Sequence, residues 1–126
     1  MIIEPDNPRK FTRIRLDQQV KLDFIDDSYY SKVQNLSMAG MFIVGDFQEH
    51  EGKYCLVDLY QTEISTDLSL RASARVVRKD AKGLAIEFVS MPSDSYKFLQ
   101  SRLPRSEDYP FKITDDSPET GIQFNN

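Results

Sequence analysis

Two arginines near the start of the chain have a spacing that suits the binding of an anion. They are Arg9 and Arg13, with a further cation, Lys10, between them. Prolines at positions 5 and 8 disfavour a helix here, so the chain is extended or turning and both guanidinium groups can converge on one ligand. A guanidinium is a planar fork of N–H donors, which pairs with two phosphate oxygens or with the O6/N7 edge of guanine.

The spacing of these arginines is a weak indication by itself. The chain has eight arginines, which produce roughly 0.5 such pairs by chance, and it holds a second pair, Arg71 and Arg75. The second pair lies among alternating apolar and polar residues, so we expect both side chains on the outer face of a strand. The plainer interpretation of the first pair is a solubilising basic segment.

A second polar group lies between Asn35 and Gly40. Asn35 and Ser37 can both donate and accept hydrogen bonds, so they can recognise a base edge or a phosphate. Gly40 has no Cβ atom, which lets the backbone turn tightly and come close to a ligand. The same residue types are common in ordinary turns. The arginine pair and this pattern occur together in roughly 3% of shuffled chains, which favours a binding site.

The segments that must position these residues have the pattern of short β-strands. Apolar residues occupy every second position from Ile14 to Phe24, apart from Gln18, and this alternation indicates a strand with one buried face. Turn residues separate five further expected strands. These strands cover residues 29–36, 41–44, 53–60, 68–77 and 84–88. Six short strands predict an all-β fold, an antiparallel barrel or sandwich.

The hydrophobic pattern changes period after the sixth strand. Tyr96, Leu99 and Leu103 lie three and four residues apart, which predicts an amphipathic helix that is capped by Ser93 and ended by Pro104. We expect this C-terminal helix to cover an open end of the barrel.

The chain divides into three parts on this pattern. Residues 1–13 form a flexible N-terminal arm, residues 14–104 the barrel with its helix, and residues 105–126 an acidic tail. The tail has five acidic residues against two basic ones. We expect it to be either disordered or weakly docked on the domain.

Composition fits one domain, since the chain has 126 residues and a mass of 14.6 kDa. Charged residues make up 29% and apolar residues 40%, which fits neither a disordered polymer nor a membrane protein. The first residues lack the apolar stretch of a signal peptide. A single cysteine, Cys55, suits the reducing cytoplasm. A pI near 5.0 argues against general binding of DNA or RNA.

Residue patterns of an enzyme or a metal site are not found in the sequence. The one histidine, His50, and the one cysteine, Cys55, make a zinc site or a nucleophile–base pair improbable. The glycine-rich loops that bind phosphates in nucleotide-dependent enzymes are missing. Cys55 lies in an apolar strand, which favours a buried and inert thiol. We therefore expect no catalytic residue, no metal and no cofactor.

At the arginine pair and the polar group, the chain resembles the PilZ family, the bacterial receptor domain for the second messenger cyclic di-GMP. The family has RxxxR before its first strand and (D/N)xSxxG after its second, which here correspond to residues 9–13 and 35–40. Residues 83–88 are similar to its glycine-led last strand, and the following helix matches in position. The resemblance covers about residues 7–103 and implies a six-stranded antiparallel β-barrel.

The resemblance also implies roles for individual residues. Arg9 and Arg13 would clasp the guanines and phosphates of cyclic di-GMP, and Lys10 would help with phosphate. Pro8, directly before the first motif, matches neither residue common there, so one bound ligand and a stacked pair both stay open.

Three residues would act from the barrel. Asn35 and Ser37 would contact a guanine, with Gly40 shaping their loop. The implied function is a cyclic di-GMP receptor in which ligand binding orders the arm. This change would control an unidentified protein effector with a motility, biofilm or virulence output.

Two other functions remain open on the sequence. One is a ligand-independent PilZ-like adaptor for pilus or flagellar machinery, although PilZ-like domains of that kind lack the motif arginines that this chain has. The other is a small barrel that binds single-stranded nucleic acid, which the acidic balance of the chain disfavours. Insertion into a membrane is not expected, because no apolar run reaches roughly 18 residues.

Overall fold

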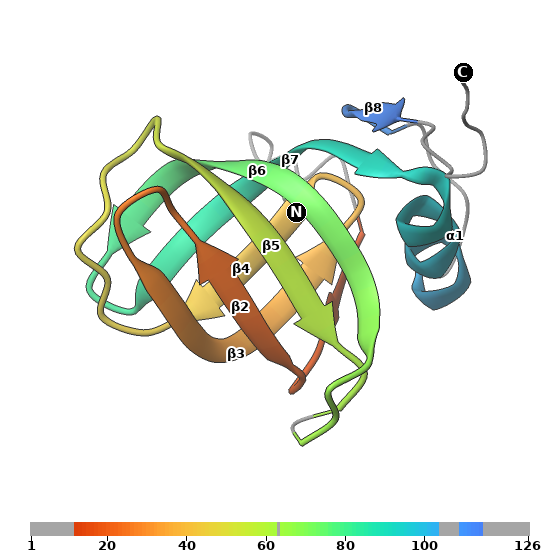
Figure 1. Cartoon of the computed structure of the whole chain (residues 1–126), viewed down its shortest axis with the longest axis horizontal. Coiled ribbons are helices and arrows are strands. Elements are labelled where there is room, and N and C mark those ends of the chain that lie inside the picture. The colour runs from red at the N-terminus through yellow and green to blue at the C-terminus, as the bar shows by residue number, and fades with distance from the viewer. Residues whose placement is uncertain (1–11, 63, 104–108, 115–126) are drawn as a thin grey trace, which may run out of the picture.

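The computed structural model describes residues 12–62, 64–103 and 109–114 of the chain (Figure 1). The elements, in chain order, are β1 (Arg13–Arg15), β2 (Gln19–Asp23), β3 (Ser28–Ser37), β4 (Gly40–Val44), β5 (Tyr54–Tyr60), β6 (Leu68–Asp80), β7 (Gly83–Pro92), α1 (Ser93–Arg102) and β8 (Lys112–Thr114). Within this part of the chain, α1 is not long and apolar enough to cross a membrane.

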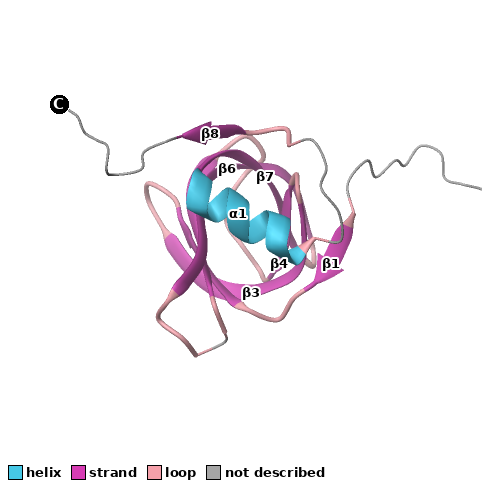
Figure 2. Ribbon diagram, turned by 90° about the vertical axis from the view of Figure 1, so that its right-hand side faces the viewer, coloured by secondary structure: helices cyan, strands magenta, loops and turns pink. Residues whose placement is uncertain are grey.

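Six of these strands close into an antiparallel barrel. Around the barrel, β2 pairs with β3, β3 with β4, β4 with β7, β7 with β6, β6 with β5, and β5 with β2 again. Figure 2 looks along the barrel and shows α1 lying across one end. The predicted all-β fold, a six-stranded antiparallel barrel with one C-terminal helix, is confirmed.

The first strand expected from the sequence is two strands in the structure. β1 and β2 both pair with β3, but three residues, 16–18, lie opposite only two, 33 and 34, so the ladder is interrupted. Leu16, Gln18 and Val20 are all buried, so the alternation continues across the break. Gln18 satisfies its buried amide by donating Nε2 to the carbonyl oxygen of Tyr60 at 2.9 Å.

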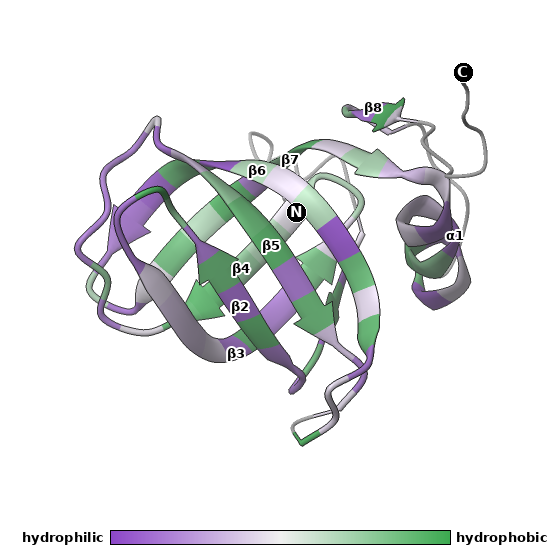
Figure 3. Ribbon diagram, in the orientation of Figure 1, coloured by the Kyte–Doolittle hydropathy of each residue, from purple (hydrophilic) through white to green (hydrophobic). Residues whose placement is uncertain are grey.

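The core fills the barrel interior with side chains from every second strand position. Hydrophobic and hydrophilic residues alternate along β2 and β5 in Figure 3, as expected for strands with one face toward the interior. The largest fully buried apolar side chains are Val20, Leu22, Leu36, Met38, Ile43, Leu59, Leu70, Leu84, Phe88, Met91 and Leu99. Burial of this kind is the main stabilising term of the fold.

The helix begins and packs in the expected place, but its capping differs from the prediction. Leu99 and Leu103 are buried and Tyr96 packs against the core. Pro92 is the N-cap residue and no side chain caps the helix, so the prediction that Ser93 caps it is wrong. A side-chain hydrogen bond also joins the helix to the barrel: the hydroxyl of Ser95 accepts the backbone N–H of Arg71 at 2.9 Å.

Part of the predicted acidic tail docks on the barrel. β8 pairs in parallel with the last residues of β7, from Ser90 to Pro92. Phe111 is buried and its ring meets the edges of Phe88 and Tyr96, with centroid distances of 5.9 and 6.0 Å. The rest of the tail, and residues 1–11 of the predicted arm, lie outside the described residues.

Candidate functional site

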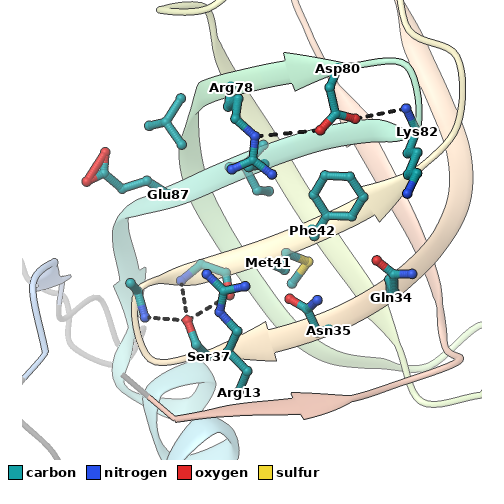
Figure 4. A pocket seen from close by; sticks show the side chains of 15 residues that line it. Arg13, Gln34, Asn35, Ser37, Met41, Phe42, Arg78, Asp80, Lys82 and Glu87 are labelled. Carbon is teal, nitrogen blue, oxygen red and sulfur yellow. Dashed lines mark hydrogen bonds and ion pairs between the residues drawn. The ribbon is translucent and has the colours of Figure 1, made fainter. Parts of the chain in front are cut away.

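A pocket of about 590 Å³ lies on the outer wall of the barrel, across β1, β3, β4, β7 and β6 (Figure 4). Four of the six residues predicted from the sequence line it, namely Arg13, Asn35, Ser37 and Gly40. The other two, Arg9 and Lys10, lie outside the described residues. The pocket is therefore the place where the two separate sequence motifs meet.

The pairing of β1 with β3 brings Arg13 to the polar residues. Arg13 lies opposite Ser37 in the ladder, and Arg15 lies opposite Asn35. Figure 4 shows the guanidinium of Arg13 beside Ser37 at the edge of the pocket. β1 extends along the same edge of β3 as β2, and this places Arg13, its first residue, beside the β3–β4 turn.

A β-bulge in β3 turns Asn35 to the outside. Val33 lies opposite Ile43 and Asn35 lies opposite Phe42, so Gln34 is an extra residue in the ladder. Val33 and Leu36 are both buried, although they lie three residues apart. In a regular strand Asn35 would point to the same side as Val33. The bulge therefore places Asn35, and Ser37 two residues on, on the pocket side.

Ser37 holds the β3–β4 turn together. Its hydroxyl oxygen accepts the backbone N–H groups of Ala39 and Gly40 at 3.1 and 3.3 Å and donates to the carbonyl of Gly40 at 3.4 Å. Such a turn, closed by a side-chain hydroxyl, is a common local structure for serine. Ser37 is 8% exposed, so it supports the turn and borders the pocket at once.

Gly40 is required by a close backbone approach. A Cβ atom at this position would lie 1.9 Å from the carbonyl oxygen of Ile86 on β7. The backbone of β4 therefore comes closer to β7 than any other residue type would permit. This contact fixes the turn of Ser37 against the pocket floor.

Several pocket residues were not predicted from the sequence. They come from β4 and from the β6–β7 hairpin: Phe42, Val77, Arg78, Asp80, Lys82, Ala85 and Glu87. The sequence indicated only that residues 79–83 form a hairpin loop. Nothing in the alternation reveals that this hairpin folds back beside β4, because the β4–β7 pairing joins segments about forty residues apart.

The carboxylate of Asp80 fixes the tip of that hairpin. Its Oδ1 atom accepts the backbone N–H groups of Lys82 and Gly83 at 2.8 and 3.2 Å. The hydrogen bond from Lys82, followed by that from Gly83, holds the pKa of Asp80 below its ordinary value against the effect of desolvation. The turn therefore keeps a negative charge at this end of the pocket near neutral pH.

The second arginine pair has its own partners on β6. Arg71 binds Asp58 with two hydrogen bonds of 2.7 and 3.1 Å, and Arg75 binds Glu87 at 2.8 Å. Both lie on the outer face of the strand, as predicted. Neither lines the pocket.

Cys55 is a buried free thiol on β5. Burial, together with the charges of Glu49 and Asp23, raises the pKa of the Cys55 thiol to about 12, so the group stays protonated and inert, as expected. In the described part of the chain no three residues among His, Cys, Asp and Glu gather to hold a metal ion.

The comparisons with known proteins agree with this fold. The structure is similar to that of the Bacillus subtilis inhibitor of motility MotI/DgrA, with a TM-score of 0.60 and 17% sequence identity. The match covers 75% of this chain and 49% of the other, so this chain spans about half of its length. No curated protein matches the chain significantly. The PilZ domain model matches residues 7–103, and the chain therefore belongs to the PilZ family.

Proposed function

We propose that this protein is a receptor for cyclic di-GMP that binds the dinucleotide in the pocket on the outer wall of the barrel. Arg9 and Arg13 approach from the N-terminal segment, with Lys10 near a phosphate, while Asn35 and Ser37 recognise a guanine edge. The observation that carries the proposal is that Arg13, Asn35, Ser37 and Gly40 line one pocket of about 590 Å³. Pockets of this size suit small-molecule ligands.

The chemistry of the ligand fits the chemistry of the pocket wall. Cyclic di-GMP carries two phosphates and two guanines, so it needs forked cations and an edge-reading amide or hydroxyl. Arg13 on β1 supplies a forked cation, and Asn35 on the neighbouring strand β3 supplies the amide. PilZ domains are in general binding domains without catalysis, and a receptor of this kind acts by changing what it contacts.

Ligand binding orders the N-terminal segment against the barrel in this proposal. Arg9 precedes β1 by four positions, and β1 borders the pocket. A ligand held by Arg9 and Arg13 together therefore ties the segment to the β3–β4 turn through new charge-assisted contacts. The resulting surface controls a protein effector, and the likeness to a motility inhibitor supports a motility output.

A ligand-independent adaptor is the second candidate, and an exposed apolar surface favours it. Ile25, Tyr54 and Leu56 are 98%, 62% and 55% exposed. Ile25 lies in the loop between β2 and β3, and Tyr54 and Leu56 lie on β5, a barrel strand that takes no part in the pocket. Exposed apolar groups of this kind mark protein contacts.

Calorimetric titration of the full-length protein separates the two functions. We expect binding of cyclic di-GMP but not of GTP or a short oligonucleotide. Arg9→Ala and Arg13→Ala should each weaken binding by about 2–4 kcal/mol, because a phosphate or base edge loses its forked partner. Arg71→Ala is the control, since Arg71 is held by Asp58 outside the pocket. Wild-type affinity in both arginine variants would show that the motif assignment is wrong.

A further inference from the structure

The wall of the pocket that faces Arg13 carries another guanidinium, which neither sequence motif includes. Arg78 lies on β6, the strand farthest from β1 across the pocket. Its guanidinium carbon is 5.7 Å from the centre of the Phe42 ring, within the range of a cation–π contact. Figure 4 shows Arg78 and Phe42 beside the same hollow, with Arg13 at its opposite edge.

One row of outward-facing residues joins Arg78 to the predicted site. Through successive strand pairs, Asn35 lies opposite Phe42, Phe42 opposite Ala85, and Ala85 opposite Arg78. Three strand spacings separate Asn35 from Arg78, about 14 Å. The small side chain of Ala85, which lies between them in the ladder, leaves room for the Phe42 ring and the Arg78 guanidinium to come within 5.7 Å of each other. The row is therefore long enough for a dinucleotide on the pocket surface to reach both ends.

A second β-bulge is what turns Arg78 toward the pocket. Val76 lies opposite Ile86 and Arg78 lies opposite Ala85, so Val77 is an extra residue in β6. Val76 is fully buried and Val77 is 40% exposed, and in a regular strand Arg78 would follow Val76 into the core. Instead Val77 and Arg78 both line the pocket. The bulge at Gln34 does the same for Asn35 on the other wall, and bulges often re-aim side chains at functional sites.

Arg78 is also the arginine of β6 that can accept a new anionic partner at little cost. Its ion pair with Asp80 is 3.6 Å long, with 58% and 43% of the two side chains exposed. Exposed pairs of this kind contribute little to stability. Asp80 is held by the backbone of the hairpin tip instead. Arg71 and Arg75, by contrast, bind their carboxylates at 2.7 and 2.8 Å.

We infer that Arg78, supported by the ring of Phe42, is a further ligand-binding residue. Of the two nucleotides of cyclic di-GMP, it holds the one that lies farther from Asn35. The planar guanidinium stacks on the base or forks onto its edge, which a point charge cannot do equally well. This inference rests on the proposed function, because it assigns the far end of the same site.

Titration calorimetry of full-length variants with cyclic di-GMP tests the inference. Arg78→Ala should weaken binding about ten- to a hundredfold, as expected for the loss of a charge-assisted forked contact. Arg78→Lys keeps the charge without the plane and should recover less than half of the loss on a logarithmic scale. Phe42→Leu keeps the apolar bulk without the ring and should weaken binding several-fold.

Arg71→Ala is the matched control, because Arg71 lies on the same strand with a similarly exposed side chain, 64% against 58%. Its affinity should equal that of the wild type. If Arg13→Ala loses binding while Arg78→Ala binds like the wild type, Arg78 is not in the site, and the receptor function stands without it. Wild-type affinity in Arg78→Lys would show that the planar shape of the guanidinium group is not needed for binding. A wild-type protein that binds no cyclic di-GMP would overturn the function and this inference together.

Discussion

Asn35 and Ser37 lie on the same strand and the same pocket wall, but their side chains contribute differently to the stability of the fold. Ser37 is buried and closes the β3–β4 turn by accepting two backbone N–H groups. Asn35 is half-buried, and among the described residues no hydrogen bond of its side chain contributes to the fold. Substituting each of them by alanine can therefore separate the role of this wall in folding from its proposed role in binding.

Asn35→Ala should lower the affinity for cyclic di-GMP and leave the free energy of unfolding within about 0.5 kcal/mol of the wild type. Ser37→Ala should lower both, because two N–H groups of the turn lose their acceptor, with about 1–2 kcal/mol of stability lost. Urea unfolding measures the second quantity and calorimetry the first. A Ser37→Ala protein as stable as the wild type would show that the turn does not depend on this hydroxyl.

Gly40→Ala should destabilise the barrel by more than about 2 kcal/mol, since a Cβ atom 1.9 Å from the carbonyl oxygen of Ile86 must push β4 away from β7. Urea unfolding checks this value. Gly52→Ala is the comparison: nothing lies within 4 Å of a Cβ there, and only its φ of +92° is unfavourable, so about 1 kcal/mol is expected. A smaller loss for Gly40 than for Gly52 would contradict the close approach of the two strands.

At the scale of the element, alternation predicted the strands because each barrel strand has one buried and one exposed face. It placed β5 from 53 to 60, where the structure has Tyr54–Tyr60. It could not reveal the break between β1 and β2, because Leu16 and Gln18 stay buried on the same face while their ladder partners shift. It could not reveal β8 either, since three residues are too few for a period to appear.

The pocket residues outside the two sequence motifs were harder to predict than the motif residues, because their positions depend on strand register. An extra residue such as Gln34 or Val77 changes the face of every side chain after it, and no residue type is specific to a bulge. Arg78 therefore has the sequence environment of any surface arginine at a hairpin. The four motif residues that line the pocket were predicted because the two motifs are rare in combination, without any knowledge of the register that brings them together.

The loop between β4 and β5 contains a buried carboxylate whose charge is balanced locally. Glu49 is 1% exposed. Its two oxygens meet Lys53 Nζ at 2.9 Å and the hydroxyl of Tyr29 at 2.9 Å. Burial alone raises the pKa of Glu49, but the hydrogen bonds from Lys53 and Tyr29 outweigh it and hold the pKa below the ordinary value. This loop is thereby tied to β3 through an ionised side chain.

The pH dependence of stability follows from that direction. A carboxyl group with a depressed pKa in the folded state stabilises the protein above its ordinary pKa of about 4.3 and loses this contribution as the pH falls through the folded value. Glu49→Gln should be less stable by about 1–3 kcal/mol at pH 7 and should lose less between pH 5 and pH 3. Urea unfolding across this range measures it.

The exposed neighbour Glu51 provides the control for that experiment, since Glu51→Gln should change the unfolding free energy by less than about 0.5 kcal/mol at every pH. Parallel pH curves for the wild type and Glu49→Gln would contradict a stabilising role of the charge.

At the scale of the whole molecule, the barrel separates two surfaces. The pocket occupies the walls made by β1, β3, β4, β7 and β6, whereas the exposed apolar residues Ile25, Tyr54 and Leu56 lie in the β2–β3 loop and on β5. The two surfaces share no residue, so a partner on one does not cover the other. Ligand recognition and a protein contact can therefore coexist on this small domain.

The segment 109–114 extends the domain beyond the family's matched range, which ends at residue 103. Phe111 is 6% exposed against Phe88 and Tyr96, so Phe111→Ala removes a buried ring at the junction of β7 and α1. We expect a loss of about 2–4 kcal/mol, because the full value for a buried ring is limited by the docking free energy of so short a segment. The urea midpoint measures this loss.

Tyr109 provides the matched control, because it lies on the same segment and is 44% exposed; Tyr109→Ala should lose less than about 1 kcal/mol. Removing residues 104–126 should destabilise the barrel at least as much as Phe111→Ala, since the edge of β7 from Ser90 to Pro92 also loses its partner β8. A shortened chain that unfolds at the wild-type urea concentration would mean that β8 rests on the barrel without stabilising it. The barrel and α1 would then carry the stability of the domain by themselves.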